Sequence, residues 1–115
     1  AKTYDIGFGD LEHLTIPYRS SNSTHVFHQY TLKTSPKYRD KLIKHLTKKE
    51  IPAMIYYPVP LYKQEAFSSY VPENYTIENS EKLCSSVFSL PIHSETENSQ
   101  QDKVIDSVRS FFNSI

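Results

Sequence analysis

The sequence predicts an α+β domain, in which helices pack on a small antiparallel or mixed sheet of three to four strands. Three runs rich in β-branched and aromatic residues, near 25–33, 53–57 and 87–91, are typical of strands. Apolar residues recur at helical spacing near 36–49 and 99–113, which indicates helices with one buried face. A chain of 115 residues is long enough for one core, so we expect residues 1–115 to form a single domain.

The N-terminal part of the chain is mostly polar. We expect residues 1–24 to form a lead-in without regular structure, anchored by Leu11, Leu14 and Ile16. The first strand begins at His25. Because successive side chains of a strand point to opposite faces, one face would carry Val26, His28, Tyr30 and Leu32.

The middle of the chain is predicted to contain one helix and one strand. Ser35 followed by Pro36 is typical of a helix start, because a capping hydroxyl precedes a proline in the first turn. A second strand at 53–57 follows this helix. It ends at Pro58 and Pro60, which cannot donate backbone hydrogen bonds. Residues 61–76 are expected to be irregular, with one turn of helix.

Two helices and a strand are predicted in the C-terminal part. A short helix over 78–87 is expected to turn Leu83, Cys84 and Val87 inward, and the third strand follows it. Thr96 or Ser99 is expected to cap the final helix. The apolar stripe of this helix is formed by Val104, Ile105, Val108, Phe111 and Phe112.

The composition excludes several classes of function. The chain has 13 Lys and Arg residues and 13 Asp and Glu residues, so its formal net charge is zero. A dedicated nucleic-acid binder normally carries an excess of basic residues, so the charge argues against that class. No apolar run approaches the roughly 20 residues of a membrane span, so we expect no membrane partner. Basic residues gather in 33–49 and acidic ones in 65–106; we interpret both as solvated faces, with a docking surface as the less favoured alternative.

Neither a metal site nor a catalytic residue is indicated. His25 and His28 would point to opposite faces of a strand, and the other histidines have no companion at ligand spacing. The single cysteine, Cys84, lies on an apolar helical stripe, where a thiol is usually inert packing. No serine lies in a glycine-flanked nucleophile turn.

The strongest candidate for a binding site is the segment from Tyr56 to Gln64, Tyr-Tyr-Pro-Val-Pro-Leu-Tyr-Lys-Gln. Its prolines stiffen the turn and so orient the neighbouring side chains at low entropic cost. Tyrosines there could stack on a flat ligand and donate a hydrogen bond, but sheet-edge packing explains them equally well. For His28, a histidine at the edge of the core is favoured over a ligand contact.

Three stretches of the chain, taken in order, resemble the C-terminal small domain of the DegT/DnrJ/StrS-type sugar aminotransferases, which are fold-type I enzymes dependent on pyridoxal phosphate. Leu14-Thr-Ile-Pro17 fits the segment before them. The stretches are His25-Val-Phe-His-Gln-Tyr30; Arg39-Asp-Lys-Leu42 to Ile51-Pro-Ala-Met-Ile-Tyr-Tyr-Pro-Val-Pro-Leu61 with Gln64; and Leu83-Cys84 to Ser89-Leu-Pro-Ile92 with Asp102-Lys-Val-Ile105.

The resemblance implies transfer of an amino group, usually from glutamate, to a keto group on a nucleotide-linked sugar, in a cytoplasmic homodimer. The family's usual His-Tyr-Pro has Tyr56 in place of the histidine, whereas Tyr57 and Pro58 are kept. With a tyrosine at position 56, the resemblance no longer implies that this residue carries a charge or transfers a proton as a histidine would. Tyr56 can still stack on a ligand and form a hydrogen bond. The resemblance implies a substrate-binding role for Tyr56, Tyr57, His28 and Gln64.

The resemblance also implies that the cofactor is held elsewhere. The Schiff-base lysine, the carboxylate that pairs with the pyridine nitrogen and the phosphate-binding groups belong to the family's large domain. No lysine here lies in the matching motif, so we expect a domain cut from an aminotransferase that binds no cofactor alone and is catalytically silent. The alternative is a stand-alone ferredoxin-like module that binds RNA or protein through Tyr30, Tyr56 and Tyr57. A purely structural or dimerisation domain is a third possibility.

Overall fold

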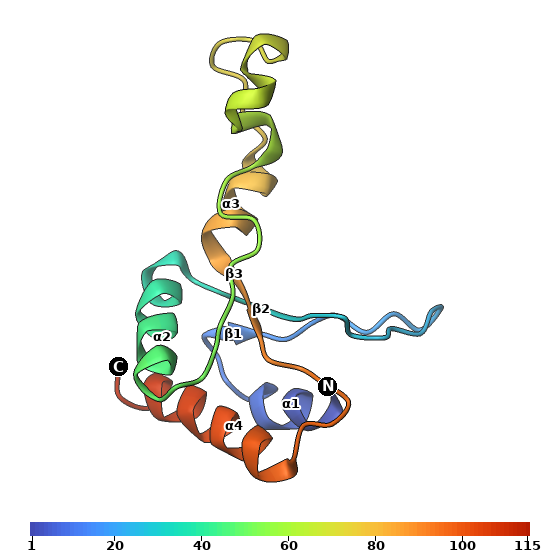
Figure 1. Cartoon of the computed structure of the whole chain (residues 1–115), viewed down its shortest axis with the longest axis vertical. Coiled ribbons are helices and arrows are strands. Elements are labelled where there is room, and N and C mark those ends of the chain that lie inside the picture. The colour runs from blue at the N-terminus through green and yellow to red at the C-terminus, as the bar shows by residue number, and fades with distance from the viewer.

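A three-stranded antiparallel sheet in the order β1-β2-β3 organises the body of the protein, in a computed structural model that describes residues 1–115 (Figure 1). The α+β class and the antiparallel sheet are therefore confirmed. In chain order, the elements are helix α1 (Lys2–Phe8), strands β1 (Leu14–Thr15) and β2 (Tyr30–Thr34), helix α2 (Pro36–Lys48), 3₁₀-helices η1 (Leu61–Lys63) and η2 (Glu65–Tyr70), helix α3 (Glu78–Ser86), strand β3 (Val87–Leu90) and helix α4 (Asn98–Phe112).

Strand β2 lies in the centre of the sheet and alternates between buried and more accessible residues. It pairs with β1 in a register that sets Thr34 opposite Leu14, and with β3 in a register that sets Tyr30 opposite Leu90. The Thr34 hydroxyl donates a 2.7 Å hydrogen bond to the carbonyl of His13, which fixes the short β1 strand. The outer edge of β3 carries a single bridge, between Met54 and Ser89.

Helices α1, α2 and α4 form the core with the sheet. α4 packs against both α1 and α2, and all three helices gather at the lower part of the molecule in Figure 1. The helices bury mainly aromatic and aliphatic side chains, which contribute roughly 1.5–3 kcal/mol each when fully buried. The buried cluster consists of Tyr4, Phe8, Leu14, Tyr30, Leu32, Leu42, Leu46, Ile51, Phe88, Leu90, Val104, Val108, Phe111 and Phe112.

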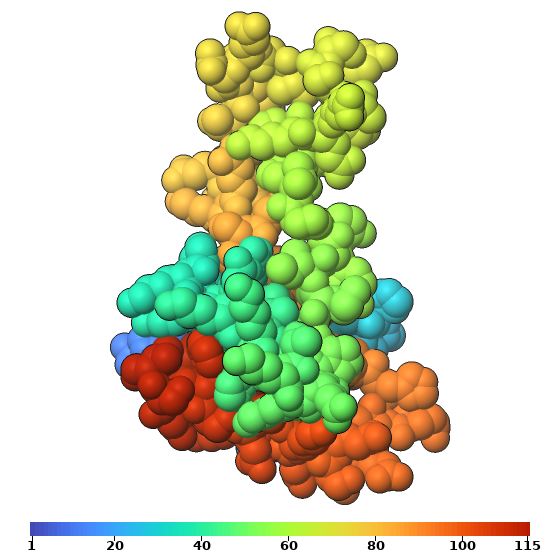
Figure 2. All heavy atoms as spheres, turned by 60° about the vertical axis from the view of Figure 1, so that its left-hand side comes forward, coloured from blue at the N-terminus to red at the C-terminus, as the bar shows by residue number.

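Two segments project from this body. The arm, which we define as residues 57–81, rises above it and carries η1, η2 and the start of α3 (Figures 1 and 2). The side loop, defined as residues 17–28, extends laterally from the sheet (Figure 1). Both segments expose large apolar side chains: Tyr18 and Val26 on the side loop, and Leu61 and Tyr70 on the arm.

The two longer helices begin as their sequences suggest, although one cap differs. The Ser35 hydroxyl accepts a 3.3 Å hydrogen bond from the backbone N–H of Lys37 at the start of α2, as predicted. At α4 the cap is Glu97 rather than Thr96 or Ser99, because Glu97 and Gln100 form a reciprocal capping box.

Five expectations about the elements are wrong. Residues 61–76 contain two 3₁₀-helices, η1 and η2, where we expected an irregular segment with one turn of helix. Residues 2–8 form a helix and 14–15 a strand, where we expected an irregular lead-in. Residues 25–29 are not in the first strand, because Phe27 has a φ of 50°, which breaks the extended backbone. Residues 53–57 keep only the bridge at Met54. Leu83, expected to point inward, is half exposed.

The α1–α4 contact gives a test of this packing. A Cβ added at Gly7 would lie 2.8 Å from Cδ1 and 2.9 Å from Cγ2 of Ile105, a β-branched side chain that cannot easily rotate away. Gly7→Ala should therefore destabilise the protein by about 1–2 kcal/mol through overpacking, despite alanine's better helix propensity.

In an Ile105→Ala background the clash is gone, so the same Gly7→Ala substitution should stabilise by up to about 1 kcal/mol. Urea unfolding of the four proteins in this double-mutant cycle measures the coupling. Additive effects of the two substitutions would contradict the close α1–α4 packing.

Candidate ligand-binding hollows

The predicted site residues lie around two adjoining hollows beside the outer edge of β3. The first, which we call the histidine cavity, has a volume of about 250 Å³. Its polar lining comes from the end of the side loop, the Met54 bridge region and the turn between β3 and α4. These polar residues are His28, Gln29, Tyr56, Ser89, His93 and Thr96, and the apolar walls are Pro52, Met54, Leu90, Pro91 and Ile92.

The second hollow, the tyrosine hollow, is more open and has a volume of about 420 Å³. It lies where the chain leaves the body and enters the arm. Tyr56 lines both hollows, and the ring of Tyr57 is 75% exposed. The remaining lining residues are Pro58, Val59, Lys63, Gln64 and Glu65.

The four residues predicted to bind substrate are thus distributed around one shared side chain. His28 and Tyr56 line the histidine cavity, while Tyr56, Tyr57 and Gln64 line the tyrosine hollow. His28 reaches the cavity from the side loop and not from a strand face shared with Tyr30, so its predicted position was wrong. The arrangement offers exposed aromatic rings and hydrogen-bonding groups, with the charged Lys63 and Glu65 in the tyrosine hollow. The binding role of the four residues stays a prediction.

Two buried tyrosines connect helix α1 to the wall of the histidine cavity and to strand β2. The hydroxyl of Tyr4 donates a 2.9 Å hydrogen bond to the carbonyl of Pro91, which is part of the cavity wall. The hydroxyl of Tyr30 donates a 2.8 Å hydrogen bond to Oδ1 of Asp5. Burial raises the pKa of Tyr4 to about 12, and burial followed by the hydrogen bond to Asp5 raises the pKa of Tyr30.

Asp5 also binds Arg19, a residue of the side loop. Nε of Arg19 donates a 3.0 Å hydrogen bond to the second carboxylate oxygen of Asp5, Oδ2. The Arg19 guanidinium lies 3.8 Å from the centroid of the Phe27 ring, which is a cation–π contact. Since Arg19 lies near the start of the side loop and Phe27 near its end, the two contacts hold both ends of the loop together next to His28.

The base of the arm is held by one carboxylate. Glu81 accepts a hydrogen bond from the Tyr62 hydroxyl and pairs with Nζ of Lys63 at 2.9 Å. The Tyr62 oxygen in turn accepts a 3.1 Å hydrogen bond from the backbone N–H of Ile77. The hydrogen bonds from Tyr62 and then Lys63 lower the pKa of Glu81. These contacts join η1 to α3, and they hold the Lys63 side chain in place next to the tyrosine hollow.

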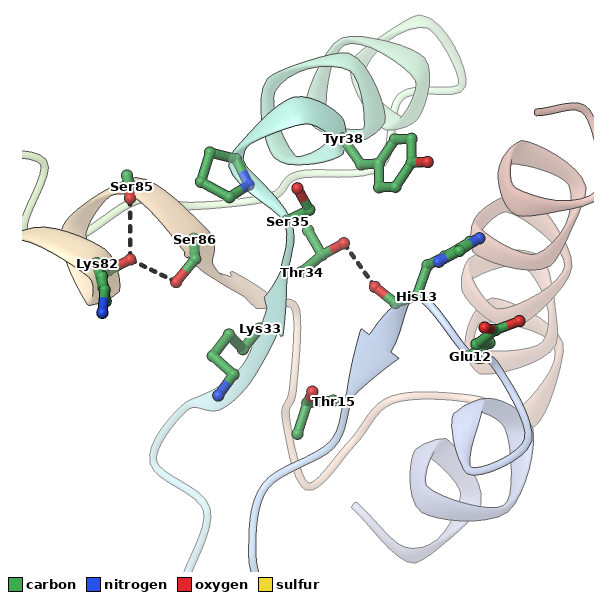
Figure 3. Close-up of a pocket in the computed structure, with 11 residues that line it drawn as sticks. Glu12, His13, Thr15, Lys33, Thr34, Ser35, Tyr38, Lys82, Ser85 and Ser86 are labelled. Carbon is green, nitrogen blue, oxygen red and sulfur yellow. Dashed lines mark hydrogen bonds between the residues drawn. The ribbon is translucent and has the colours of Figure 1, made fainter. Parts of the chain in front are cut away.

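A third hollow, of about 460 Å³, lies between β1, β2 and α3 (Figure 3). Three of its hydroxyl groups donate hydrogen bonds within the chain: those of Ser85 and Ser86 to the carbonyl of Lys82, and that of Thr34 to the carbonyl of His13. The ammonium group of Lys82 pairs with Glu78. Glu12, Thr15, Lys33 and Tyr38 also line it, but none of the four residues predicted to bind substrate does.

The side chains provide no metal site and no buried lysine. No group of three or more His, Cys, Asp or Glu residues is placed to hold a metal ion. None of the buried side chains is a lysine, whereas covalent catalysis by a lysine needs that residue in a desolvated pocket. No helix is both long enough and apolar enough to span a membrane.

The fold and the hollows together define a class: a small α+β protein with aromatic and polar hollows beside a sheet edge. The chain matches the model of the DegT/DnrJ/EryC1/StrS aminotransferase family over residues 1–109, and it belongs to this family. The resemblance found in the sequence is thereby confirmed, and it replaces the alternative of a stand-alone ferredoxin-like module.

Individual relatives support this membership. The chain is 36% identical over 104 residues to a pleiotropic regulatory protein of Geobacillus stearothermophilus, covering 90% of this chain and 27% of that protein. It is 31% identical over 111 residues to the dTDP-3-amino-3,4,6-trideoxy-α-D-glucose transaminase of Streptomyces venezuelae, covering 96% of this chain and 29% of that one.

A solved structure shows the same fold. The crystal structure of S. venezuelae DesV in complex with a ketimine intermediate superposes with a TM-score of 0.91 at 29% identity, covering 99% of this chain and 30% of that chain. The chain thus spans about 30% of the length of the relatives that it matches. Aminotransferases of this family use pyridoxal phosphate.

Sequence reasoning missed part of the histidine cavity. Gln29, His93 and Thr96 line it, yet no spacing in the sequence links them, because the β3–α4 turn and the side loop bring them together. Met54 was noted only as part of a strand. The one available signal was the position of His93 directly after the Leu90-Pro-Ile92 stretch.

The buried tyrosines predict a loss of stability at high pH. The raised pKa values of Tyr4 and Tyr30 mean that the folded state holds these protons more tightly than the unfolded state, in which tyrosine ionises near pH 10. Their stabilisation is therefore complete below pH 10 and is lost as the pH rises above it. Urea unfolding between pH 8 and 12 should show a free energy of unfolding that falls above pH 10.

Tyr4→Phe should make that fall shallower, whereas Tyr70→Phe, which alters an exposed ring on the arm, should leave it unchanged. An unaltered pH profile for Tyr4→Phe would show that the buried hydroxyl does not control the effect.

Proposed function

We propose that residues 1–115 form the C-terminal small domain of a longer, pyridoxal-phosphate-dependent sugar aminotransferase. The enzyme transfers an amino group, with glutamate as the donor, to the keto group of a nucleotide-linked sugar. Family membership supports the amino-transfer chemistry, and relatives that are transaminases of dTDP-linked amino sugars support the class of substrate. A homodimer in the cytoplasm is part of the proposal.

The observation that carries the proposal is the shared position of Tyr56 between the histidine cavity and the tyrosine hollow. A nucleotide-sugar has an apolar, flat part and a hydroxyl-rich part, so it needs aromatic surface next to neutral hydrogen-bonding groups. The two hollows offer these side by side: the ring of Tyr57 on one side of Tyr56, and His28 with Gln29 on the other.

On this proposal, the cofactor and the sugar are bound by different parts of the enzyme. Pyridoxal phosphate, when bound to the whole enzyme, supplies the electron sink for amino transfer. The residues described here bind and orient the sugar, and a preceding large domain holds the cofactor. On this proposal the isolated chain neither binds the cofactor specifically nor catalyses transfer, because its lysines are solvated amines.

Replacement of Tyr57 tests the substrate-facing role in the full-length protein. Tyr57→Ala removes an exposed aromatic platform and its hydroxyl, so kcat/KM for the keto nucleotide-sugar should fall by about 5- to 150-fold, or about 1–3 kcal/mol of transition-state binding. Cofactor absorbance should stay unchanged, since no contact to the cofactor is removed.

Tyr70→Ala is the matched control, because Tyr70 is equally exposed on the arm but lines neither hollow. Its kinetics should equal those of the unmodified enzyme. If Tyr57→Ala behaves like Tyr70→Ala, the tyrosines serve only in packing at the sheet edge.

A further inference from the structure

His93 is held in one orientation by its own turn. The backbone N–H of Glu95 donates a 3.0 Å hydrogen bond to Nδ1 of His93, in the segment between β3 and α4. A ring nitrogen that accepts a hydrogen bond carries no proton, so the neutral imidazole has its proton on Nε2. His93 is thereby set as a hydrogen-bond donor through Nε2, and it lines the histidine cavity.

The other lining residues indicate what this donor meets. No Lys, Arg, Asp or Glu side chain lines the histidine cavity. Its polar groups are neutral amides, hydroxyls and imidazoles, and its remaining walls are proline, methionine, leucine and isoleucine. A diphosphate needs cations or several backbone donors, whereas a sugar ring needs neutral donors and acceptors beside C–H surface. The cavity therefore suits the sugar and not the diphosphate.

We propose that His93 is a sugar-binding residue, whose Nε2–H donates a hydrogen bond to a ring-substituent oxygen of the nucleotide-linked sugar in the histidine cavity. The inference rests on the proposed function, because it assumes that a nucleotide-sugar is the ligand. Two features of the fold fix the position of His93: the Tyr4 hydrogen bond to the Pro91 carbonyl, two residues earlier, and the Glu97 cap of α4, four residues later.

The chain contains a matched control for this histidine. The backbone N–H of Phe27 donates a 2.8 Å hydrogen bond to Nδ1 of His25, the same two-residue turn as at His93. His25 does not line the histidine cavity. A substitution at His25 therefore reports the loss of such a turn contact without loss of a cavity donor.

Three variants of the full-length protein separate the two roles of His93. His93→Asn keeps an acceptor near the Nδ1 position but removes the Nε2 donor. His93→Gln keeps an amide N–H near the Nε2 position but loses the acceptor of the turn. His25→Asn is the control. Calorimetric titration with dTDP and dTDP-glucose, and with UDP and UDP-glucose, isolates the affinity that the sugar adds to each nucleotide.

In the unmodified protein we expect one of the two nucleotide-sugars to bind more tightly than its free nucleotide. His93→Asn should weaken binding of that nucleotide-sugar by about 3- to 10-fold, the effect of one hydrogen bond, and leave the free nucleotide unchanged. His93→Gln should restore most of the lost affinity. His25→Asn should bind as the unmodified protein does.

Three results would overturn the role of His93: no weakening in His93→Asn, equal weakening in His93→Asn and His93→Gln, or no added affinity from either sugar in the unmodified protein. The proposed function fails separately, if the unmodified enzyme transfers no amino group from glutamate to any keto nucleotide-sugar. A sugar-binding protein without transferase activity would thus keep the His93 assignment and lose the proposed function.

Discussion

The packing of Tyr4 and Tyr30 between α1 and the sheet is the constraint on which the rest of the structure depends. Their ring centroids lie 5.0 Å apart, and both side chains are fully buried. Each ring carries a hydroxyl that needs a partner in the core. The Tyr4 hydroxyl finds it at the carbonyl of Pro91, and the Tyr30 hydroxyl finds it at Asp5. Because a buried hydroxyl without a partner is costly, these two bonds fix the position of Pro91 after β3 and of Tyr30 at the start of β2, directly after the side loop.

The same constraint produces the candidate site. β3 ends at Leu90, next to Pro91, and its outer edge pairs only at Ser89, where it meets Met54. Prolines at 52, 58 and 60 withhold backbone donors from the neighbouring segment, so the sheet does not extend there. What would have been a fourth strand becomes an irregular segment whose side chains, including those of Tyr56 and Tyr57, remain accessible. The accessible tyrosines therefore result from the interrupted strand.

Local signals predicted the elements that depend on local chemistry. The Ser35-Pro36 pair was sufficient to predict the start of α2, and the helical spacing of apolar residues was sufficient to predict that α2 and α4 are helices. Both signals act within a few residues of the chain. Helix α1 was missed because its sequence, KTYDIGF, has weak helix propensity and is stabilised by burial of Tyr4 and Phe8 against distant elements. The site residues also fall into those that local sequence predicts and those that it does not. The tyrosine segment was visible in the sequence, whereas His93 and Gln29 meet Tyr56 only through tertiary contacts.

The central claim is that this chain contributes the sugar-binding side of an aminotransferase site. A crystal structure of the full-length protein with its cofactor and a bound nucleotide-sugar tests it most directly. The account predicts that the sugar lies against Tyr56 in the histidine cavity, with the cofactor held by residues outside 1–115. A nucleotide-sugar that contacts neither the histidine cavity nor the tyrosine hollow would contradict it.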